Sequence, residues 1–129
     1  MHKLFTLENK AIVITGSSRG IGKGMAKRFA EFGAKLIISS RKIDACKEVE
    51  EEINKNGGIA FSKECNISEK TQCDELIEFC IEKYGRLDVL VCNAASNPYY
   101  GDLEKIPDKL FDKIMNNNVK SNLWLCKKA

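Results

Sequence analysis

The chain has 129 residues, of which 43% are hydrophobic, so it can bury the core of one domain but not of two. Its 21 Lys and Arg residues are nearly balanced by 18 Asp and Glu residues, and the net charge of +3 excludes a polybasic nucleic-acid surface and an acidic disordered tail. No apolar run approaches the ~20 residues of a membrane helix, and the start of the chain lacks the apolar stretch of a secretion signal. We therefore expect a cytoplasmic protein that binds neither nucleic acid nor membranes.

The apolar pattern predicts strands that alternate with helices. Residues 11–15 are apolar on successive positions, as in a parallel strand that is covered on both faces. Further strands are expected at 35–39, 59–65 and 87–92. Helices are expected after each strand, the first from Gly22 to Gly33, the second from a cap at Asp44 to the break at 56–58, the third from Ser68 to Gly85, and the last from Pro107.

The apolar residues of these helices recur at helical spacing. The first helix carries them on one side, at Ile21, Met25, Phe29 and Phe32. The last helix has the broadest such face, formed by Leu110, Phe111, Ile114, Met115, Asn118, Val119, Leu123 and Cys126. Strand and helix alternate four times, which predicts a parallel sheet with right-handed crossovers, the doubly wound α/β fold. Ligands of such sheets lie beyond the carboxyl ends of the strands.

The cysteines do not indicate a metal site. They form no C-x-x-C pair, and the only histidine is His2, so neither zinc-ligand spacing nor a redox motif is present and we expect no metal. We expect reduced, mostly buried thiols that act as small hydrophobic side chains. The six are Cys46, Cys65, Cys73, Cys80, Cys92 and Cys126.

A glycine-rich turn joins the first strand to the first helix. Gly16, Gly20 and Gly22 lie where a tight turn and an unhindered helix N-terminus would leave backbone N–H groups facing a phosphate. The alternative is a turn that is merely tight. A nucleoside-triphosphate loop is excluded by spacing, because that motif needs a glycine at Ser17 and a hydroxyl residue at Gly24.

Three motifs in this order resemble the short-chain dehydrogenases/reductases. Residues 15–22, T-G-S-S-R-G-I-G, match the family signature T-G-x-x-x-G-x-G, and Cys92-Asn93-Ala94-Ala95 is similar to its N-N-A-G motif. Asn118 matches the asparagine of the catalytic tetrad. Residues 39–42 and 93–101 resemble in particular the carbonyl- and retinol-reductase branch that uses NADP(H). The resemblance implies an NAD(P)-binding Rossmann domain over residues 1–129, incomplete, with the first four strand-helix units.

The residues after the second strand favour NADP over NAD. An NAD site places an acidic residue there to bind the ribose 2′-hydroxyl, whereas this chain has Ser39-Ser40-Arg41. The Arg41 guanidinium can hold a 2′-phosphate, with the Ser40 hydroxyl as a further donor and Arg19 reaching over from the glycine turn. The alternative is that Arg41 is an ordinary surface charge.

The resemblance extends the candidate site to the later strands. Asn66 stands where the family has an aspartate that hydrogen-bonds the adenine amino group, and its side-chain oxygen can still accept that bond. Ile67 would lie beside the adenine ring. Residues 93–95 would line the path from adenosine to nicotinamide. The candidate cofactor-binding residues are Gly16, Ser17, Ser18, Arg19, Gly20, Ile21, Gly22, Ser40, Arg41, Asn66, Ile67, Asn93, Ala94 and Ala95.

Asn118 is the one candidate catalytic residue. In the family the matching asparagine distorts its helix locally, and its backbone holds a water in a proton relay. From the residues alone, Asn118 is a polar residue on an apolar helix face whose amide must find partners.

In the resembled family a tyrosine donates the proton to the substrate and a lysine four residues later lowers the pKa of that tyrosine. These residues contain no such Y-x-x-x-K pair, because no lysine stands four positions after Tyr84, Tyr99 or Tyr100. We therefore expect no turnover by these 129 residues alone. The leading hypothesis is the N-terminal, cofactor-binding part of an NADP(H)-dependent oxidoreductase acting on small carbonyl or alcohol substrates. The alternatives are a non-catalytic nucleotide-binding module and a structural α/β domain that binds nothing. The resemblance also implies a homo-oligomer.

Overall fold

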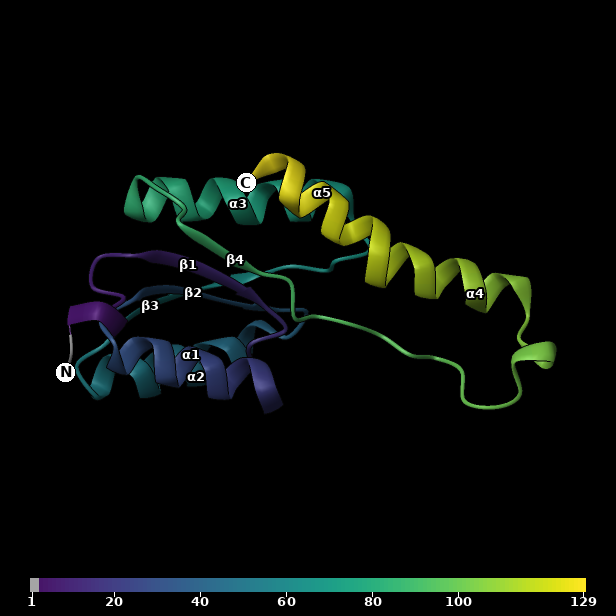
Figure 1. Cartoon of the computed structure of the whole chain (residues 1–129), viewed down its shortest axis with the longest axis horizontal. Helices are drawn as coiled ribbons and strands as arrows, with labels where there is room; N and C mark the ends of the chain where they lie inside the picture. The colour runs from purple at the N-terminus through teal and green to yellow at the C-terminus, as the bar shows by residue number, and fades with distance from the viewer. Residues whose placement is uncertain (1–2) are drawn as a thin grey trace.

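Four parallel strands form one sheet in the computed structural model, which describes residues 3–129 (Figure 1). The predicted doubly wound arrangement is therefore confirmed, while His2 lies outside the described residues. The strand order across the sheet is β3-β2-β1-β4. The strands are β1 (Ala11–Thr15), β2 (Lys35–Ser40), β3 (Ile59–Glu64) and β4 (Val89–Val91).

Helices cover both faces of this sheet. Figure 1 shows α1 and α2 on one face and α3 and α5 on the other, while α4 extends past the sheet at the end of a long loop that follows β4. No helix within residues 3–129 has the length and apolar content to cross a bilayer. The helices are α1 (Gly20–Glu31), α2 (Ile43–Lys55), α3 (Lys70–Tyr84), α4 (Asp108–Met115) and α5 (Ser121–Lys128), with short 3₁₀ turns at Lys3–Phe5 and Leu103–Lys105.

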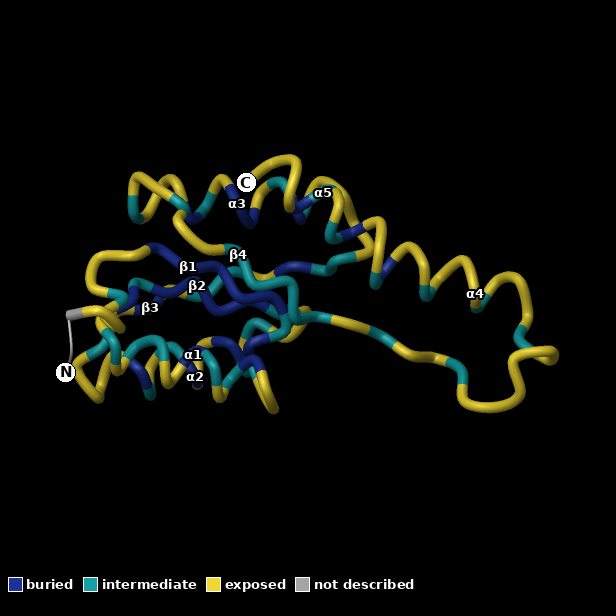
Figure 2. The backbone as a smooth tube through the Cα atoms, in the orientation of Figure 1, coloured by how far each residue is buried: buried dark blue, intermediate teal, exposed yellow. Residues whose placement is uncertain are grey.

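The two faces of the sheet bury alternate residues of the same strands. Ile12 and Ile14 pack against the α1/α2 layer, and Ala11 and Val13 pack against the α3/α5 layer. All five residues of β1 are buried, because β1 is an inner strand covered on both sides (Figure 2). The core therefore consists of two apolar layers that share the central strands.

Glycines end three of the helices near the predicted positions. Gly33 follows α1 with a φ of 91°, Gly57 follows α2 with a φ of 88°, and Gly85 caps α3 with a φ of 71°. A left-handed residue at this position lets the next N–H groups satisfy the last carbonyls of the helix. Gly85, for example, donates its N–H to the carbonyl of Ile81 at 2.7 Å.

Several predicted boundaries and burials are wrong. Asp44 lies in the first turn of α2 and does not cap it, because Lys42 is the residue before the helix. Ser68 precedes α3 in a separate turn with Asn66, so that helix begins two residues later than predicted. Ile21 is 78% exposed, since it lies in the first turn of α1 and lines a cavity rather than the core.

The predicted last helix contains a π-helical turn, Asn116–Lys120, between α4 and α5. Its broad apolar face is not buried within this chain. Leu125 is fully buried, whereas Cys126 is exposed. Buried positions follow one another at a spacing of four, at Asn117, Ser121 and Leu125. Exposed apolar residues also recur at a spacing of four, at Phe111, Met115, Val119 and Leu123.

The cysteines are free thiols, four of them buried, as predicted. Cys92 is half-buried and Cys126 is exposed. Within residues 3–129 no group of His, Cys, Asp and Glu side chains has the arrangement of a metal site.

We expect alkaline pH to destabilise the fold through these thiols. Burial raises the pKa of Cys80 to about 11, and burial together with the nearby Cys126 thiol raises the pKa of Cys92 to about 11. An unfolded cysteine ionises near a pKa of ~8.5, so above that pH the unfolded state releases protons that the folded state retains. The free energy of unfolding should therefore fall from about pH 8.5 to pH 11.

Urea unfolding followed by circular dichroism at pH 7.5 and pH 10 measures this effect. A Cys80→Ala variant should show a shallower fall than the wild type, because one of the raised pKa values is removed. Equal slopes for the two proteins would contradict the assignment to Cys80.

Candidate functional site

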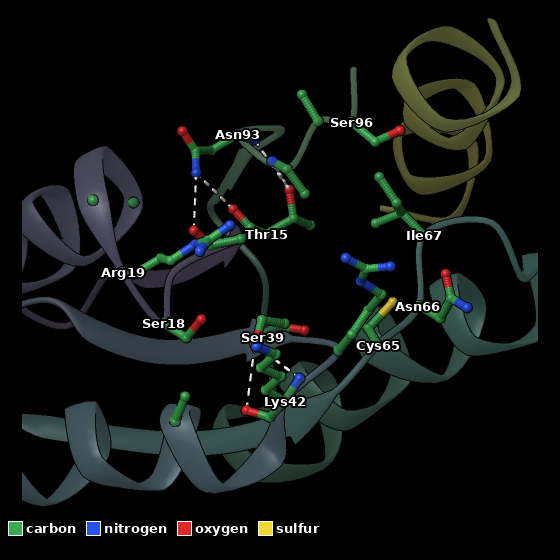
Figure 3. Close-up of a pocket in the computed structure, with 18 of the residues that line it drawn as sticks. Thr15, Ser18, Arg19, Ser39, Lys42, Cys65, Asn66, Ile67, Asn93 and Ser96 are labelled. Carbon is green, nitrogen blue, oxygen red and sulfur yellow. Dashed lines mark hydrogen bonds between the residues drawn. The ribbon is translucent and has the colours of Figure 1, made fainter. Parts of the chain in front are cut away.

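A cavity of about 530 Å³ opens beyond the carboxyl ends of the strands (Figure 3). This is the edge at which a doubly wound sheet binds its ligands, and the volume is typical of a small-molecule site. Its walls come from the turn after β1 and from the segments that follow the other three strands. The lining residues are Thr15, Gly16, Ser18, Arg19, Gly20, Ile21, Gly22, Ser39, Ser40, Arg41, Lys42, Ala45, Cys65, Asn66, Ile67, Asn93, Ala94, Ala95, Ser96 and Asn117.

The structure brings all the candidate residues to this cavity except Ser17 and Asn118. Their contacts with a ligand stay a prediction. The lining also includes residues that were not among the candidates, and all of them except Ala45 lie next to a candidate in the chain. Position is the signal that could have found those beside a strand exit, whereas Ala45 lies inside α2 and Asn117 lies in the turn before α5. The additional lining residues are Thr15, Ser39, Lys42, Ala45, Cys65, Ser96 and Asn117.

The glycine turn leaves the N-terminus of α1 open to the cavity. Gly16 and Gly20 have φ angles of 65° and 58°, which favour glycine. A Cβ atom on Gly22 would lie 2.3 Å from the carbonyl oxygen of Gly16, so this position has no room for a side chain. The residue before α1, Arg19, makes no side-chain cap, and the first turn holds no acidic residue. The first N–H groups of α1 are therefore available to an anion.

Ser17 has a structural role in this turn. It is completely buried, its hydroxyl donates to the carbonyl of Ile14 at 2.7 Å, and it accepts a hydrogen bond from the Ser39 N–H at 2.9 Å. The Ser17 side chain thus ties the glycine turn to the end of β2. Its expected contact with the cofactor does not fit this placement, because the hydroxyl faces the sheet.

Thr15 and Asn93 lock the glycine turn to the segment after β4. The Thr15 hydroxyl accepts hydrogen bonds from the backbone N–H groups of Asn93 at 3.0 Å and Ala94 at 2.9 Å. In return, the Asn93 amide donates to the carbonyls of Thr15 and Gly16, each at 3.1 Å. Asn93 therefore shapes the phosphate turn through its side chain as well as lining the cavity.

The charged residues of the cavity wall are all cationic. They are Arg19, Arg41 and Lys42, and the described lining contains no carboxylate. Ser40 differs from the expectation that its hydroxyl is free for a phosphate. The Ser40 oxygen accepts a hydrogen bond from the Lys42 N–H at 3.1 Å and lies 3.2 Å from the Cys46 sulfur, so it stabilises the turn that carries Arg41.

Asn66 also differs from its expected role. Its side-chain oxygen accepts two hydrogen bonds from Ser68, one from the N–H at 3.1 Å and one from the hydroxyl at 2.8 Å. An amide oxygen has two lone pairs, and Ser68 occupies both. In this arrangement both lone pairs of the oxygen are used within the chain, and a bond to it from an adenine amino group stays a prediction.

Asn118 lies just outside the cavity and holds its β4 wall. Its amide oxygen accepts from the Ser96 N–H at 2.8 Å, and its amide nitrogen donates to the Ser96 carbonyl at 2.7 Å. The Asn118 carbonyl accepts a hydrogen bond from Asn122 at 3.0 Å. The π turn at this point confirms the expected local distortion of the helix. The neighbouring Asn117 reaches the cavity and donates to the Ser96 hydroxyl at 2.9 Å.

Two features of the cavity fit a dinucleotide phosphate. The first is the cradle at Gly22, which a side chain would fill. The second is the hydroxyl of Ser39, which is 1% exposed, lines the cavity and has no hydrogen-bond partner in the described part of the chain. Buried hydroxyl groups are usually paired, so an unpaired one at a cavity wall fits a polar ligand there.

A parallel doubly wound sheet with a glycine turn at its first crossover defines a Rossmann-type α/β protein. A family model described as short chain dehydrogenase matches residues 10–129. The chain therefore belongs to the short-chain dehydrogenase/reductase family, as the three motifs predicted.

Relatives of known name and structure agree with this assignment. The chain is 35% identical over 119 residues to Short-chain dehydrogenase/reductase SDRA of Arabidopsis thaliana. The matched region covers 92% of this chain and 47% of that protein. It is 36% identical over 122 residues to Tropinone reductase-like 3 of Erythroxylum coca, covering 95% of this chain and 47% of that protein.

Solved structures are similar as well. Hydroxysteroid dehydrogenase from Escherichia coli superposes with a TM-score of 0.89 at 34% identity, over 95% of this chain and 52% of that chain. A metagenomic short-chain oxidoreductase in complex with NADP gives a TM-score of 0.88 at 30% identity, over 95% and 55% of the two chains. This chain thus spans about half the length of the proteins it matches.

Proposed function

We propose that this chain is the cofactor-binding part of an NADP(H)-dependent oxidoreductase acting on a small carbonyl or alcohol substrate. The observation that carries the choice of NADP is the charge of the cavity wall, where Arg19, Arg41 and Lys42 face no carboxylate among the described lining residues. A ribose 2′-phosphate needs positive charge at the end of the second strand, and a free 2′-hydroxyl is bound there by an acidic residue. The NADP found in the metagenomic relative supports the same choice.

Each part of the cavity has a task in this proposal. The N–H groups of the glycine turn and of the first turn of α1 hold the pyrophosphate, and the dipole of α1 adds to the attraction. Arg41 and Arg19 hold the 2′-phosphate through charge-assisted hydrogen bonds. Bound in this way, the dinucleotide supplies or accepts the hydride. Asn118 fixes the Ser96 segment and stays the candidate for a proton relay.

The chain itself is expected to bind the cofactor without turning over substrate. A general acid typically contributes ~10²–10⁴ to the rate, and residues 1–129 contain no tyrosine with a lysine four positions later. A carbonyl substrate mixed with NADPH and this chain should therefore show no loss of NADPH absorbance above the uncatalysed rate. Steady NADPH consumption by the pure chain would overturn this expectation.

The NADP preference is tested by titrating the chain with NADPH and with NADH and following nucleotide fluorescence. We expect NADPH to bind at least tenfold more tightly than NADH. Arg41→Ala should weaken NADPH binding by about tenfold, since a hydrogen bond to a charged group contributes about 1.5–3 kcal/mol. NADH binding should change by less than about twofold, because it lacks the group that Arg41 contacts.

Arg28→Ala is the matched control. Arg28 lies in the last turn of α1, is outside the cavity lining, and pairs with Glu31 on the surface. This variant should bind both dinucleotides like the wild type. Equal affinities for NADH and NADPH, unchanged in Arg41→Ala, would contradict the NADP preference. No binding of either dinucleotide by folded protein would favour the structural α/β domain.

A further inference from the structure

Arg41 is carried by the short turn that joins β2 to α2. The residue is exposed and lines the cavity, and its neighbours in the turn are Ser40 and Lys42. A binding side chain keeps a fixed position only when packing and hydrogen bonds hold the residues that support it. The direction of the Arg41 guanidinium therefore depends on what holds the residues on either side of it.

Cys46, in the first part of α2, contacts both neighbours of Arg41. Its sulfur lies 3.2 Å from the Ser40 hydroxyl oxygen, and its backbone N–H donates to the Lys42 carbonyl at 3.1 Å. Cys46 is completely buried and belongs to the apolar layer on the α1/α2 side of the sheet. One core residue thus attaches the turn to the core at two points.

The Cys46 thiol is the donor in its contact with Ser40. The Ser40 hydroxyl has one proton, which it donates to the Lys42 carbonyl across 3.4 Å. Burial raises the pKa of the Cys46 thiol, so the thiol keeps its own proton. The Ser40 oxygen accepts from this thiol and from the Lys42 N–H at 3.1 Å. The donor and both acceptor sites of the Ser40 hydroxyl are therefore used within the chain.

We propose that Cys46 is a positioning residue for cofactor selection, which holds Ser40 and so fixes the turn that directs Arg41 at the ribose 2′-phosphate. The inference rests on the proposed function, and Cys46 itself lies outside the cavity lining. Loss of the thiol removes the hydrogen bond that ties Ser40 to the core. The cost falls on NADPH, because NADH lacks the phosphate that Arg41 would bind.

Fluorescence titration of variants with NADPH and with NADH tests this role. Cys46→Ala removes the donor and should lower the ratio of NADPH affinity to NADH affinity by about fivefold, as expected for one hydrogen bond. Cys46→Ser keeps a donor and should retain the wild-type ratio within about twofold. Ser40→Ala removes the acceptor, and adding Cys46→Ala to it should lower the ratio no further, because both side chains act through one contact.

Cys80→Ala is the matched control. Cys80 is also a completely buried helical cysteine, its thiol donates to the Arg86 carbonyl at 3.4 Å, and it lies outside the cavity lining. This variant should keep the wild-type ratio of affinities. Circular dichroism checks that each variant is folded, and Ser40→Ala takes the place of Cys46→Ala if the latter does not fold, since it removes the same hydrogen bond at a half-buried position.

A wild-type ratio in folded Cys46→Ala would overturn the inference. An equal fall in Cys46→Ser or in Cys80→Ala would do the same, and so would a further fall in the double variant. These results leave the NADP preference of the wild type, and with it the proposed function, standing. Equal binding of NADPH and NADH by the wild type would instead overturn the choice of NADP together with the inference.

Discussion

Replacing Gly22 by alanine is expected to abolish dinucleotide binding and to lower the free energy of unfolding by about 3 kcal/mol. The added Cβ would lie 2.3 Å from the Gly16 carbonyl oxygen and 2.6 Å from the amide nitrogen of Asn93. Neither atom belongs to a flexible side-chain end that could move aside, because the carbonyl is backbone and the Asn93 amide is bonded to two carbonyls. Relief of the clash must therefore shift the turn that would hold the pyrophosphate.

Gly24→Ala provides the matched control in the same helix. Nothing lies within 4 Å of a Cβ added at Gly24, and alanine is favoured over glycine inside a helix by roughly 0.5–1 kcal/mol. Gly24→Ala should therefore bind NADPH like the wild type and unfold at slightly higher urea concentration. Binding of NADPH to Gly22→Ala with wild-type affinity would show that the turn does not hold the phosphates.

Replacing Thr15 by valine should have the second large effect, with a loss of about 1–3 kcal/mol in the free energy of unfolding. Valine has nearly the shape of threonine, so packing is kept while the hydroxyl is lost. The backbone N–H of Ala94 then loses its acceptor, at a site that is 2% exposed at Thr15 itself, and the N–H of Asn93 keeps only the Val91 carbonyl at 3.0 Å. An unpaired donor of this kind is more costly than the hydrogen bond is favourable.

Two control variants, Thr15→Ser and Thr71→Val, distinguish the loss of the Thr15 hydroxyl from the other effects of a substitution. Thr15→Ser keeps the acceptor and should retain most of the stability, whereas Thr71→Val alters an exposed residue of α3 and should have little effect. Urea unfolding measures the stabilities, and NADPH titration should show weaker binding for Thr15→Val, since the lock positions Asn93 against the glycine turn. Wild-type stability of Thr15→Val would contradict the expected cost of leaving the Ala94 N–H without an acceptor.

The strands were the most predictable part of the fold. Residues 11–15 form β1 as expected, because a strand buried on both faces is distinguished by its uninterrupted apolar run. The fourth strand was predicted over 87–92 and covers only Val89–Val91, since the length of an edge strand depends on a partner that its own residues do not encode. The glycines that end the helices were also predictable, because few other residues adopt a positive φ.

The position of the candidate site was predictable from the sequence, but the hydrogen-bond partners of its polar side chains were less so. Strand exits in a parallel sheet meet at one edge, which is why Arg19, Arg41 and Asn93 could be grouped from their places in the chain. The hydroxyl of Ser17 and the amide oxygen of Asn66 instead make bonds inside the protein. Such bonds depend on angles and on neighbours in space, which residue type and spacing do not determine.

The π turn at Asn116–Lys120 also determines the shape of the outer surface. Residues four apart wind around an α-helix by about 40° per step, so three steps from Phe111 to Leu123 would turn a row of side chains by about 120°. The π turn holds one residue more than an α-helical turn, and this extra residue reduces the rotation of the row by about 100°. The four exposed apolar side chains thus form a nearly straight ridge parallel to the helix axis, and the distortion that brings Asn118 to Ser96 is also what straightens it.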